Sequence, residues 1–404
     1  MDLVALVQRA AEGARDHPGL ADLTPGTREY EELRLNYVED SPEIDEVGRA
    51  VLIAAGYDPE YPYQIRMSPT SSRSGSGQKM FGNPVIARAR TRGAVAAIEE
   101  MLDLLKSNEV EQHEIVSVWG CHPETSIELA DGVQLMAMSD LPRSVYRDMC
   151  LQLPPYDSGT SSMMSVVAKP RAALVRTFVH GPILVRLEDD VPKVDLWGQR
   201  LMDYTLPLTA ATRRPIFPLS HWCQSDETTP LVGLGGGAGG QSVLRLFQFE
   251  GVAPVDADRA LAMTRQYFEL EPALHRGLRI ALNRLRLTHT RDWYDERVLD
   301  LGIALEAALF SDKEEYQGEI TLRLRLRGVH LLGGDAEKRR LTWKLLGDVY
   351  ALRSRVAHGG RSPHGDEAAE RVIDDGVALA FDLCERLLEL GERPDFDAAA
   401  RGAD

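Results

Sequence analysis

Arg353 and His358 are the two residues of this 404-residue chain whose types and spacing point most clearly to chemistry. They lie in the segment 350–360, YALRSRVAHGG, with four residues between them. Histidine has an ordinary pKa near neutrality, so it can accept or donate a proton in a reaction at physiological pH. Arginine stays charged, and its planar fork matches the oxygens of a phosphate. The pair therefore predicts proton transfer beside a phosphate whose growing charge is stabilised.

A helix must position this pair. Apolar residues at helical spacing predict a helix over about 336–358 that Gly359 and Gly360 end. Its expected buried stripe is Leu341, Leu345, Val349, Leu352 and Val356. Residues five apart on an ideal helix point about 140° apart, so Arg353 and His358 cannot share one face. Either the helix end frays and His358 swings round, or one site takes these residues from two chains.

The context of the pair resembles HEPN domains of the Apea-like kind, whose signature is R-x4-6-H. The segment Asp300–Leu309, DLGIALEAAL, is similar to the acidic helix that precedes the motif in that family. The segment 327–332, RGVHLL, is similar to its short middle helix, and the order of elements and the trailing glycines also match. The resemblance covers residues 256–392, and no named family is identified for residues 1–250.

This resemblance implies a metal-independent endoribonuclease without a cofactor, in which the RNA 2′-hydroxyl attacks its own phosphate. The products would be a 2′,3′-cyclic phosphate and a 5′-hydroxyl. Arg353 and His358 would be catalytic, supported by Glu306, Ser354 and Arg355. Ser354 stands where many active members carry an amide or an acid. HEPN dimers pair two motifs across a composite groove, so the resemblance also implies a homodimer through the C-terminal bundle and a role in bacterial anti-phage defence or toxin-like growth arrest.

A non-catalytic interpretation stays open, because many HEPN domains are scaffolds that dimerise or bind nucleotide. His358 would then only interact with the helix C-terminus, where a cation is favoured. Arg353 would be a structural partner of Glu306. Catalysis predicts Arg353 and His358 facing an open basic groove, whereas the scaffold predicts both buried. A third hypothesis is a regulator whose N-terminal region binds a ligand and whose bundle only dimerises.

The charge pattern bears on the RNA substrate. The net charge of −16 argues against a general nucleic-acid coat, but residues 321–361 hold ten Lys or Arg against three acids. Such a stripe can attract a phosphate backbone even on an acidic protein, although a solvated helix face has the same composition. The residues expected to bind RNA are Arg323, Arg327, Arg339, Arg340 and Lys344. The more acidic N-terminal region is expected to respond to an unknown trigger and to compete with RNA for this stripe.

Composition bounds the class of protein. A chain of 404 residues exceeds what one core supports, and 44% hydrophobic with 27% charged residues is ordinary for a globular protein. No run of about 18 apolar residues predicts a membrane span. The N-terminus lacks the features of a signal peptide, and four cysteines do not make a disulfide framework. We therefore expect a cytoplasmic protein without membrane contact.

The spacing of apolar residues predicts an α+β N-terminal region with a small, mostly antiparallel sheet, followed by an all-α bundle, which the resemblance identifies as HEPN-type. The expected parts are a helical and loop region over 1–110, an α+β region over 111–253, a bundle over 254–394 and a disordered tail over 395–404. Residues 67–79 are expected to form a mobile loop, Asp131-Gly132 predicts a hairpin turn, and residues 205–230 allow no assignment.

Two further motifs are weighed and assigned no function. Residues 233–240, GLGGGAGG, lack the Gly-Lys-Ser/Thr ending of a phosphate loop and are predicted to be a flexible loop. Cys121-His122 and the His221–Cys223 segment offer two thiols and two imidazoles, but not the usual C-x2-4-C spacing of a zinc site. The tryptophans beside them predict packed core positions, so we expect no metal.

Overall fold

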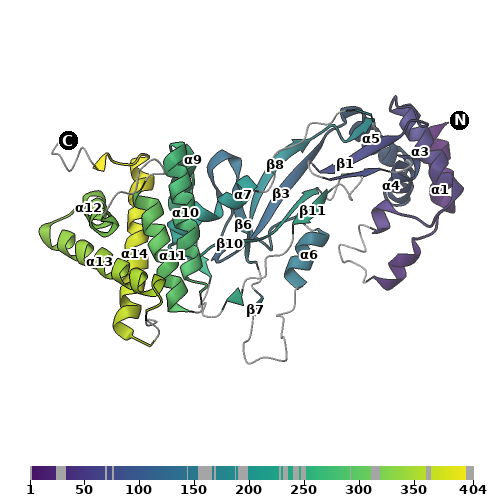
Figure 1. Ribbon diagram of the computed structural model, residues 1–404. Helices are drawn as coiled ribbons and strands as arrows, with labels where there is room; N and C mark the ends of the chain where they lie inside the picture. The colour runs from purple at the N-terminus through teal and green to yellow at the C-terminus, as the bar shows by residue number, and fades with distance from the viewer. Residues whose placement is uncertain are drawn as a thin grey trace.

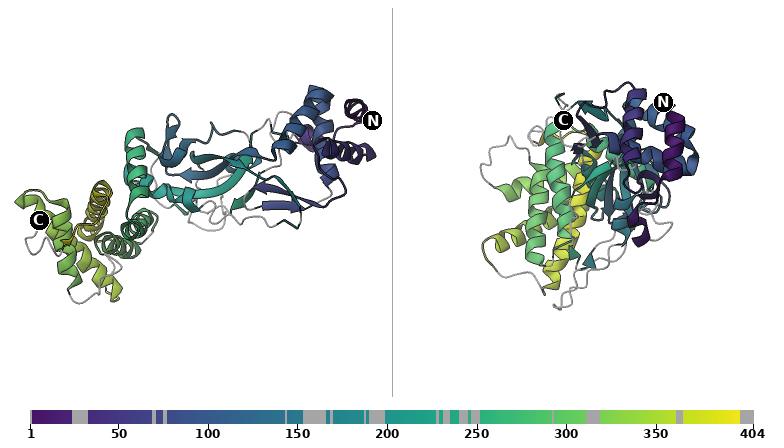
Figure 2. Two further views of the ribbon diagram at one scale, coloured as in Figure 1. Left: turned by 90° about the horizontal axis from the view of Figure 1, so that it is seen from above. Right: turned by 90° about the vertical axis from the view of Figure 1, so that its right-hand side faces the viewer.

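The structure is a computed structural model with three parts arranged along an elongated molecule (Figure 1). N-terminal helices lie at one end, an antiparallel sheet in the middle and a helical bundle at the other end, and the left view of Figure 2 shows the same order. The structure describes residues 2–23, 33–68, 71–74, 77–142, 144–152, 166–167, 170–186, 188–189, 199–226, 229–230, 235–239, 245–246, 252–291, 293–310, 319–360 and 365–396. None of the described helices is long and apolar enough to cross a membrane.

The N-terminal part packs four helices against a short sheet. The helices are α1 (Leu3–Gly13), α3 (Pro42–Ala54), α4 (Gly77–Arg92) and α5 (Ala94–Ser107). The sheet has the order β2-β1-β9, from β2 (Ser71–Ser74), β1 (Tyr63–Ser68) and β9 (Leu184–Arg186). The expectation of a mobile loop over residues 67–79 is wrong for the part of this range that the structure describes, because that part contains β2 and the start of α4.

Close backbone contact between α3 and α4 explains why the pattern of apolar residues did not predict α4. A Cβ atom at Gly48 would lie 1.8 Å from the Gln78 carbonyl oxygen, and one at Gly82 would lie 1.9 Å from the Ile44 carbonyl oxygen. Only glycine allows α3 and α4 to approach this closely. The helix thus packs through small residues as well as large ones, and its apolar stripe is weak.

The central part is a six-stranded sheet in the order β11-β10-β3-β8-β6-β5, with every neighbouring pair antiparallel. Its strands are β3 (Val110–Trp119), β5 (Ile127–Glu128), β6 (Gln134–Ala137), β8 (Ala172–His180), β10 (Phe217–Ser225) and β11 (Gly235–Gly239). Two minor pairs join β12 (Arg245–Leu246) to β7 (Val166–Val167) and β13 (Ala253–Pro254) to β4 (Cys121–His122). The expected small antiparallel sheet and the turn at Asp131 and Gly132 are confirmed.

Two segments of this sheet correct the sequence interpretation. Residues 205–230, which allowed no assignment, contain α8 (Thr205–Thr212) and the strand β10 beside the centre of the sheet. Residues 235–239 of the glycine run form the strand β11 rather than a flexible loop. A strand pairs through its backbone, so β10 can hold a glycine segment that offers no side chain to pack. The other helices of this part are α6 (Val145–Gln152) and α7 (Gln199–Asp203).

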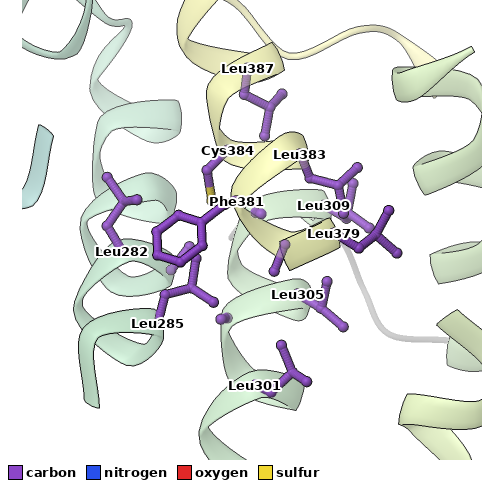
Figure 3. Packing of buried hydrophobic residues seen from close by; sticks show 14 of the residues in the cluster. Leu282, Leu285, Leu301, Leu305, Leu309, Leu379, Phe381, Leu383, Cys384 and Leu387 are labelled. Atoms are coloured by element: carbon purple, nitrogen blue, oxygen red, sulfur yellow. The ribbon is translucent and has the colours of Figure 1, made fainter. Parts of the chain in front are cut away.

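The C-terminal part is an all-helical bundle, as expected. Its helices are α9 (Ala257–Glu269), α10 (Pro272–Thr288), α11 (Tyr294–Leu309), α12 (Ile320–Leu332), α13 (Ala336–Ala357) and α14 (Glu367–Leu390). The side chains of Asp256, Asp335 and Asp366 accept hydrogen bonds from N–H groups in the first turns of α9, α13 and α14. Figure 3 shows Phe381 of α14 pointing toward Leu282 and Leu285 of α10 in the bundle core.

Two details of the bundle differ from expectation. In α13, Leu341 is 52% exposed, although it was placed on the buried stripe. The buried residues of that helix form a face that packs against α11, α12 and α14: Thr342, Leu346, Gly347, Val349, Tyr350 and Leu352. Phe396, expected in a disordered tail, is buried against the bundle, and residues 397–404 lie outside the described residues.

Arginines connect the helical bundle to α8 in the central part of the molecule. Arg213, at the end of α8, donates to both carboxylate oxygens of Glu385 on α14, at 2.7 and 2.8 Å. Arg259 of α9 pairs with Glu385 within the bundle, at 2.8 Å, and its Nε atom donates to the Ala211 carbonyl oxygen of α8 at 2.7 Å. Arg286 of α10 donates to the Thr205 hydroxyl at 3.1 Å, and burial lowers the pKa of Arg286 to about 10. These contacts hold the two parts in a fixed arrangement.

Candidate active site

Arg353 lies near the end of α13, in a slot formed by α11. Its Nη2 atom is 3.5 Å from Oε1 of Glu306, and the hydroxyl of Tyr350 donates to the same oxygen at 3.1 Å. The guanidinium also lies over the Tyr350 ring, 5.4 Å from its centroid. Gly302 gives the side chain room, because a Cβ there would be 2.7 Å from the Arg353 Cγ atom. Gly302 and Glu306 are one helical turn apart, so α11 supplies both the space and the charge.

This slot leaves Arg353 partly accessible. The exposed fractions of the two side chains are 29% for Arg353 and 24% for Glu306. The Nε atom of Arg353 is buried and has no hydrogen-bond partner among the described residues. The arginine is therefore paired, as the scaffold interpretation expects, but the pair is not sealed from solvent. The role of Tyr350 was missed from the sequence, although its position three residues before Arg353 puts it on the same side of a helix.

His358 is the residue that caps the C-terminus of α13. Its backbone N–H donates to the Ser354 carbonyl oxygen at 3.2 Å, and Gly359 follows with a φ of +74°. The imidazole is exposed and has no hydrogen-bond partner among the described residues. The side chains of Arg353 and His358 form no hydrogen bond with each other. His358 therefore lies at the helix end, exposed to solvent, while Arg353 lies against α11.

The supporting residues lie close by along the chain. Ser354 is half-buried, and Arg355 is exposed. The Arg355 side chain lies over Gly360, where a Cβ would be 2.6 Å from its Cγ atom. No ion pair holds the Arg355 guanidinium among the described residues. Arg355 and His358 are thus both exposed at the C-terminal end of α13.

Arg327, expected to bind RNA, is a structural residue. It is only 4% exposed, and its Nη1 atom donates to the Leu309 carbonyl oxygen at 3.0 Å. Its guanidinium lies over the rings of Phe310 and Phe396, at 4.8 and 5.2 Å. The expectation for Arg327 is therefore wrong. Its buried guanidinium donates to a carbonyl oxygen at the end of α11 and packs against Phe396 of the C-terminal segment. Arg323 is half-buried over the same Phe310 ring, at 5.7 Å.

Neighbouring acids interrupt the rest of the basic stripe. Arg340 pairs with Glu337 at 2.7 Å, and Lys344 pairs with Asp348 at 2.8 Å. Arg339 is exposed and forms no ion pair with a described residue. The groove between α13 and α14, with a volume of about 440 Å³, is lined by Leu341, Lys344, Leu345, Asp348, Val372, Asp375, Ala378, Leu379 and Asp382. Three carboxylates against one lysine make this groove unsuited to a phosphate backbone.

Arg327 and Arg339 should therefore respond oppositely to replacement by alanine. Arg327→Ala should lower the free energy of unfolding by about 1–3 kcal/mol, because the Leu309 carbonyl loses its buried donor. Arg339→Ala should leave stability within about 0.5 kcal/mol and weaken RNA binding more at low salt than at high salt. Urea unfolding and filter binding at two salt concentrations measure both effects. A stable Arg327→Ala protein with weakened RNA binding would reverse this assignment.

A second group of polar residues lies within the sheet. The Glu114 carboxylate on β3 is fully buried, accepts a hydrogen bond from Arg176 on β8 and lies 3.0 Å from His221 Nε2 on β10. Burial alone would raise the pKa of Glu114, but His221 and Arg176 together hold it below its ordinary value. In the sequence, the signal of this group is a carboxylate among the apolar residues of a strand.

The cysteine and histidine motifs do not meet. Cys223 lies opposite Glu114, whereas Cys121 lies in β4, beyond the other end of β3. Burial raises the pKa of Cys121 to about 12, and burial with the nearby Glu114 raises that of Cys223 to about 12. Both thiols are therefore protonated at neutral pH, which argues against a nucleophilic thiolate. The packed core positions expected from Trp119 and Trp222 are confirmed by their exposed fractions of 7% and 1%.

Comparison with known proteins adds no relative: no protein-family model, curated protein or solved structure matches this chain. The likeness to HEPN domains thus rests on the residues and order of elements in this chain.

Proposed function

We propose that the C-terminal bundle is a metal-independent endoribonuclease of the HEPN kind and that residues 1–253 regulate it. The observation that carries this proposal is the end of α13. It presents the exposed side chains of Arg355 and His358, shortly after Arg353, which contacts Glu306 and the ring of Tyr350. By the same resemblance, the RNA damage would serve growth arrest or defence against phage.

The proposed reaction uses the side chains of His358 and Arg353. His358 takes the proton of a 2′-hydroxyl, whose oxygen then attacks the adjacent phosphorus. The bond between O2′ and phosphorus forms as the bond from phosphorus to the 5′-oxygen breaks, and a protonated imidazole supplies the proton to that leaving oxygen. Arg353 donates to the phosphate oxygens while their charge grows. The products are a 2′,3′-cyclic phosphate and a 5′-hydroxyl.

A homodimer is expected, because one chain keeps the two reactive side chains apart. Arg353 faces α11, His358 faces solvent, and no hydrogen bond joins them. A two-fold pairing of bundles would let the histidine of one chain approach the arginine of the other. Light scattering of the full chain at micromolar concentration should give twice the mass of 44.8 kDa. A monomer that retains cleavage would contradict the composite site.

Cleavage is expected to proceed in EDTA. Histidine and arginine suffice for attack by the 2′-hydroxyl, and no group of three metal-ligating side chains lies among the described residues of the bundle. The assay follows a labelled RNA and identifies its ends by their resistance to ligation and by phosphatase treatment. Activity that is lost in EDTA and restored by magnesium would contradict this mechanism.

The ion pair between Arg353 and Glu306 favours a second candidate, a scaffold that dimerises or binds nucleotide without turnover. In that case the pair stabilises the packing of α13 on α11 and has no reactive role. Glu306→Gln separates the two, because it removes the charge and keeps the shape. A scaffold should lose stability only, whereas a nuclease should also change its cleavage rate as Arg353 becomes free to approach phosphate.

A further inference from the structure

A group of metal-ligating side chains lies on the sheet, away from the bundle. Glu111, His113 and Asp226 each offer one ligand atom, and these atoms lie within 4.8 Å of one another. Glu111 and His113 alternate along β3, so their side chains point to the same side of the sheet. Asp226 follows the last residue of β10, where Ser225 pairs with Gln112, and therefore comes opposite Glu111. Two adjacent strands thus hold all three ligands.

His113 is held in the orientation that a metal ligand needs. Its Nδ1 atom lies 2.9 Å from the hydroxyl of Thr177, the residue directly opposite it on β8. Its Nε2 atom lies 3.2 Å from Oδ1 of Asp226. When Nδ1 carries the proton and donates it to Thr177, the lone pair of Nε2 faces the two carboxylates. Histidines that bind metals almost always have such a partner on the other ring nitrogen.

The local charge also favours a cation. Among the described residues, Asp226 pairs with His113, at 3.2 Å, and no lysine or arginine forms an ion pair with Glu111 or with Asp226. A bound cation would take the place of the proton between His113 and Asp226. Two carboxylates this close repel each other, and a divalent ion would neutralise both. The site is open to solvent, because the side chains of Asp226 and His113 are 49% and 14% exposed. A metal ion can therefore enter without a rearrangement of the sheet.

We propose that Glu111, His113 and Asp226 bind one divalent cation of the zinc class, with a fourth position open to water or a ligand. One imidazole nitrogen and two carboxylate oxygens suit Zn²⁺ better than Mg²⁺, which prefers six oxygen ligands. Three protein ligands with an open position are typical of zinc sites that act on a bound molecule. The site lies on the sheet, so metal binding can be measured independently of RNA cleavage; its use as a regulatory input rests on the proposed function.

The test uses the full chain after treatment with a chelator. Titration with Zn²⁺ by calorimetry should give one ion per chain, and Co²⁺ at the same site should give visible absorption bands of a low-coordinate complex. His113→Ala and Glu111→Gln should each weaken Zn²⁺ binding at least 10-fold. Thr177→Val should weaken it by about 10- to 100-fold, because the imidazole loses its orienting partner. His122→Ala, which removes an exposed histidine outside the group, should bind as wild type does.

Three results would overturn the proposal. The first is wild-type Zn²⁺ affinity in both His113→Ala and Glu111→Gln. The second is the absence of a one-to-one Zn²⁺ complex at micromolar protein. The third is displacement of Zn²⁺ by an equal concentration of Mg²⁺. Glu111 is exposed, so Glu111→Gln should melt like the metal-free wild type and keep the test valid even if His113→Ala unfolds.

Discussion

Replacing His358 by alanine is expected to slow RNA cleavage by about 10²–10⁴-fold, the usual contribution of a general acid or base. The fold should survive, because the imidazole is exposed and the last buried residue of α13 is Leu352. The free energy of unfolding should change by no more than about 0.5 kcal/mol. Initial rates on a labelled RNA and a thermal melt of the same preparation measure both. His122→Ala, another exposed histidine, is the matched control and should cleave at the wild-type rate.

A His358→Ala protein that melts like wild type and cleaves at the wild-type rate would remove the nuclease assignment from this motif. One that unfolds would instead favour a structural role for the histidine. Arg353→Ala is a less direct test, because it leaves Glu306 without its cation at a half-buried site. Arg353→Lys keeps the positive charge and loses the fork, so it should preserve stability better than alanine and still lose most of the rate.

Replacing Glu114 by glutamine is expected to cost about 3–5 kcal/mol in the free energy of unfolding, the range for breaking a buried ion pair from one side. The glutamine would leave the Arg176 guanidinium without its carboxylate at a site where Glu114 is fully buried. Urea unfolding of the sheet region, followed through tryptophan fluorescence, measures the loss. Glu128→Gln, an exposed acid on β5 of the same sheet, is the matched control and should change little.

The contribution of Glu114 to the free energy of unfolding should also decrease at acidic pH. Burial opposes its charge, but His221 and Arg176 lower its pKa below the ordinary 4.5. A carboxylate whose folded pKa is depressed stabilises the fold fully above the unfolded pKa and loses that effect as pH falls through the folded pKa. The stability difference between wild type and Glu114→Gln should therefore shrink as pH falls below about 4.5. A difference that grows on acidification would contradict the depressed pKa.

The sequence by itself determined the helical half of this protein. Aspartates before α9, α13 and α14 and glycines after α12 and α14 mark ends that depend on neighbours in the chain. The helix expected over about 336–358 agrees with α13, Ala336–Ala357, to within one residue. The same local chemistry puts His358 at a helix end followed by Gly359. The ends of α13 and the spacing of Arg353 and His358 could therefore be read directly, and so could the conclusion that one helix face cannot hold both.

Only the tertiary structure decided which side chains meet. Strand β10 is positioned by its pairing with β3, and the glycines of β11 by their pairing with β10. These pairings use backbone hydrogen bonds, which do not depend on residue type, so the sequence pattern did not predict them. The burial of Arg327 depends on two phenylalanines, one of them 69 residues away along the chain, at Phe396. The groups around Glu114 and His113 arise from the register of strands β3, β8 and β10. Long-range packing and register set these contacts, and neither is visible in the spacing of residues along one segment.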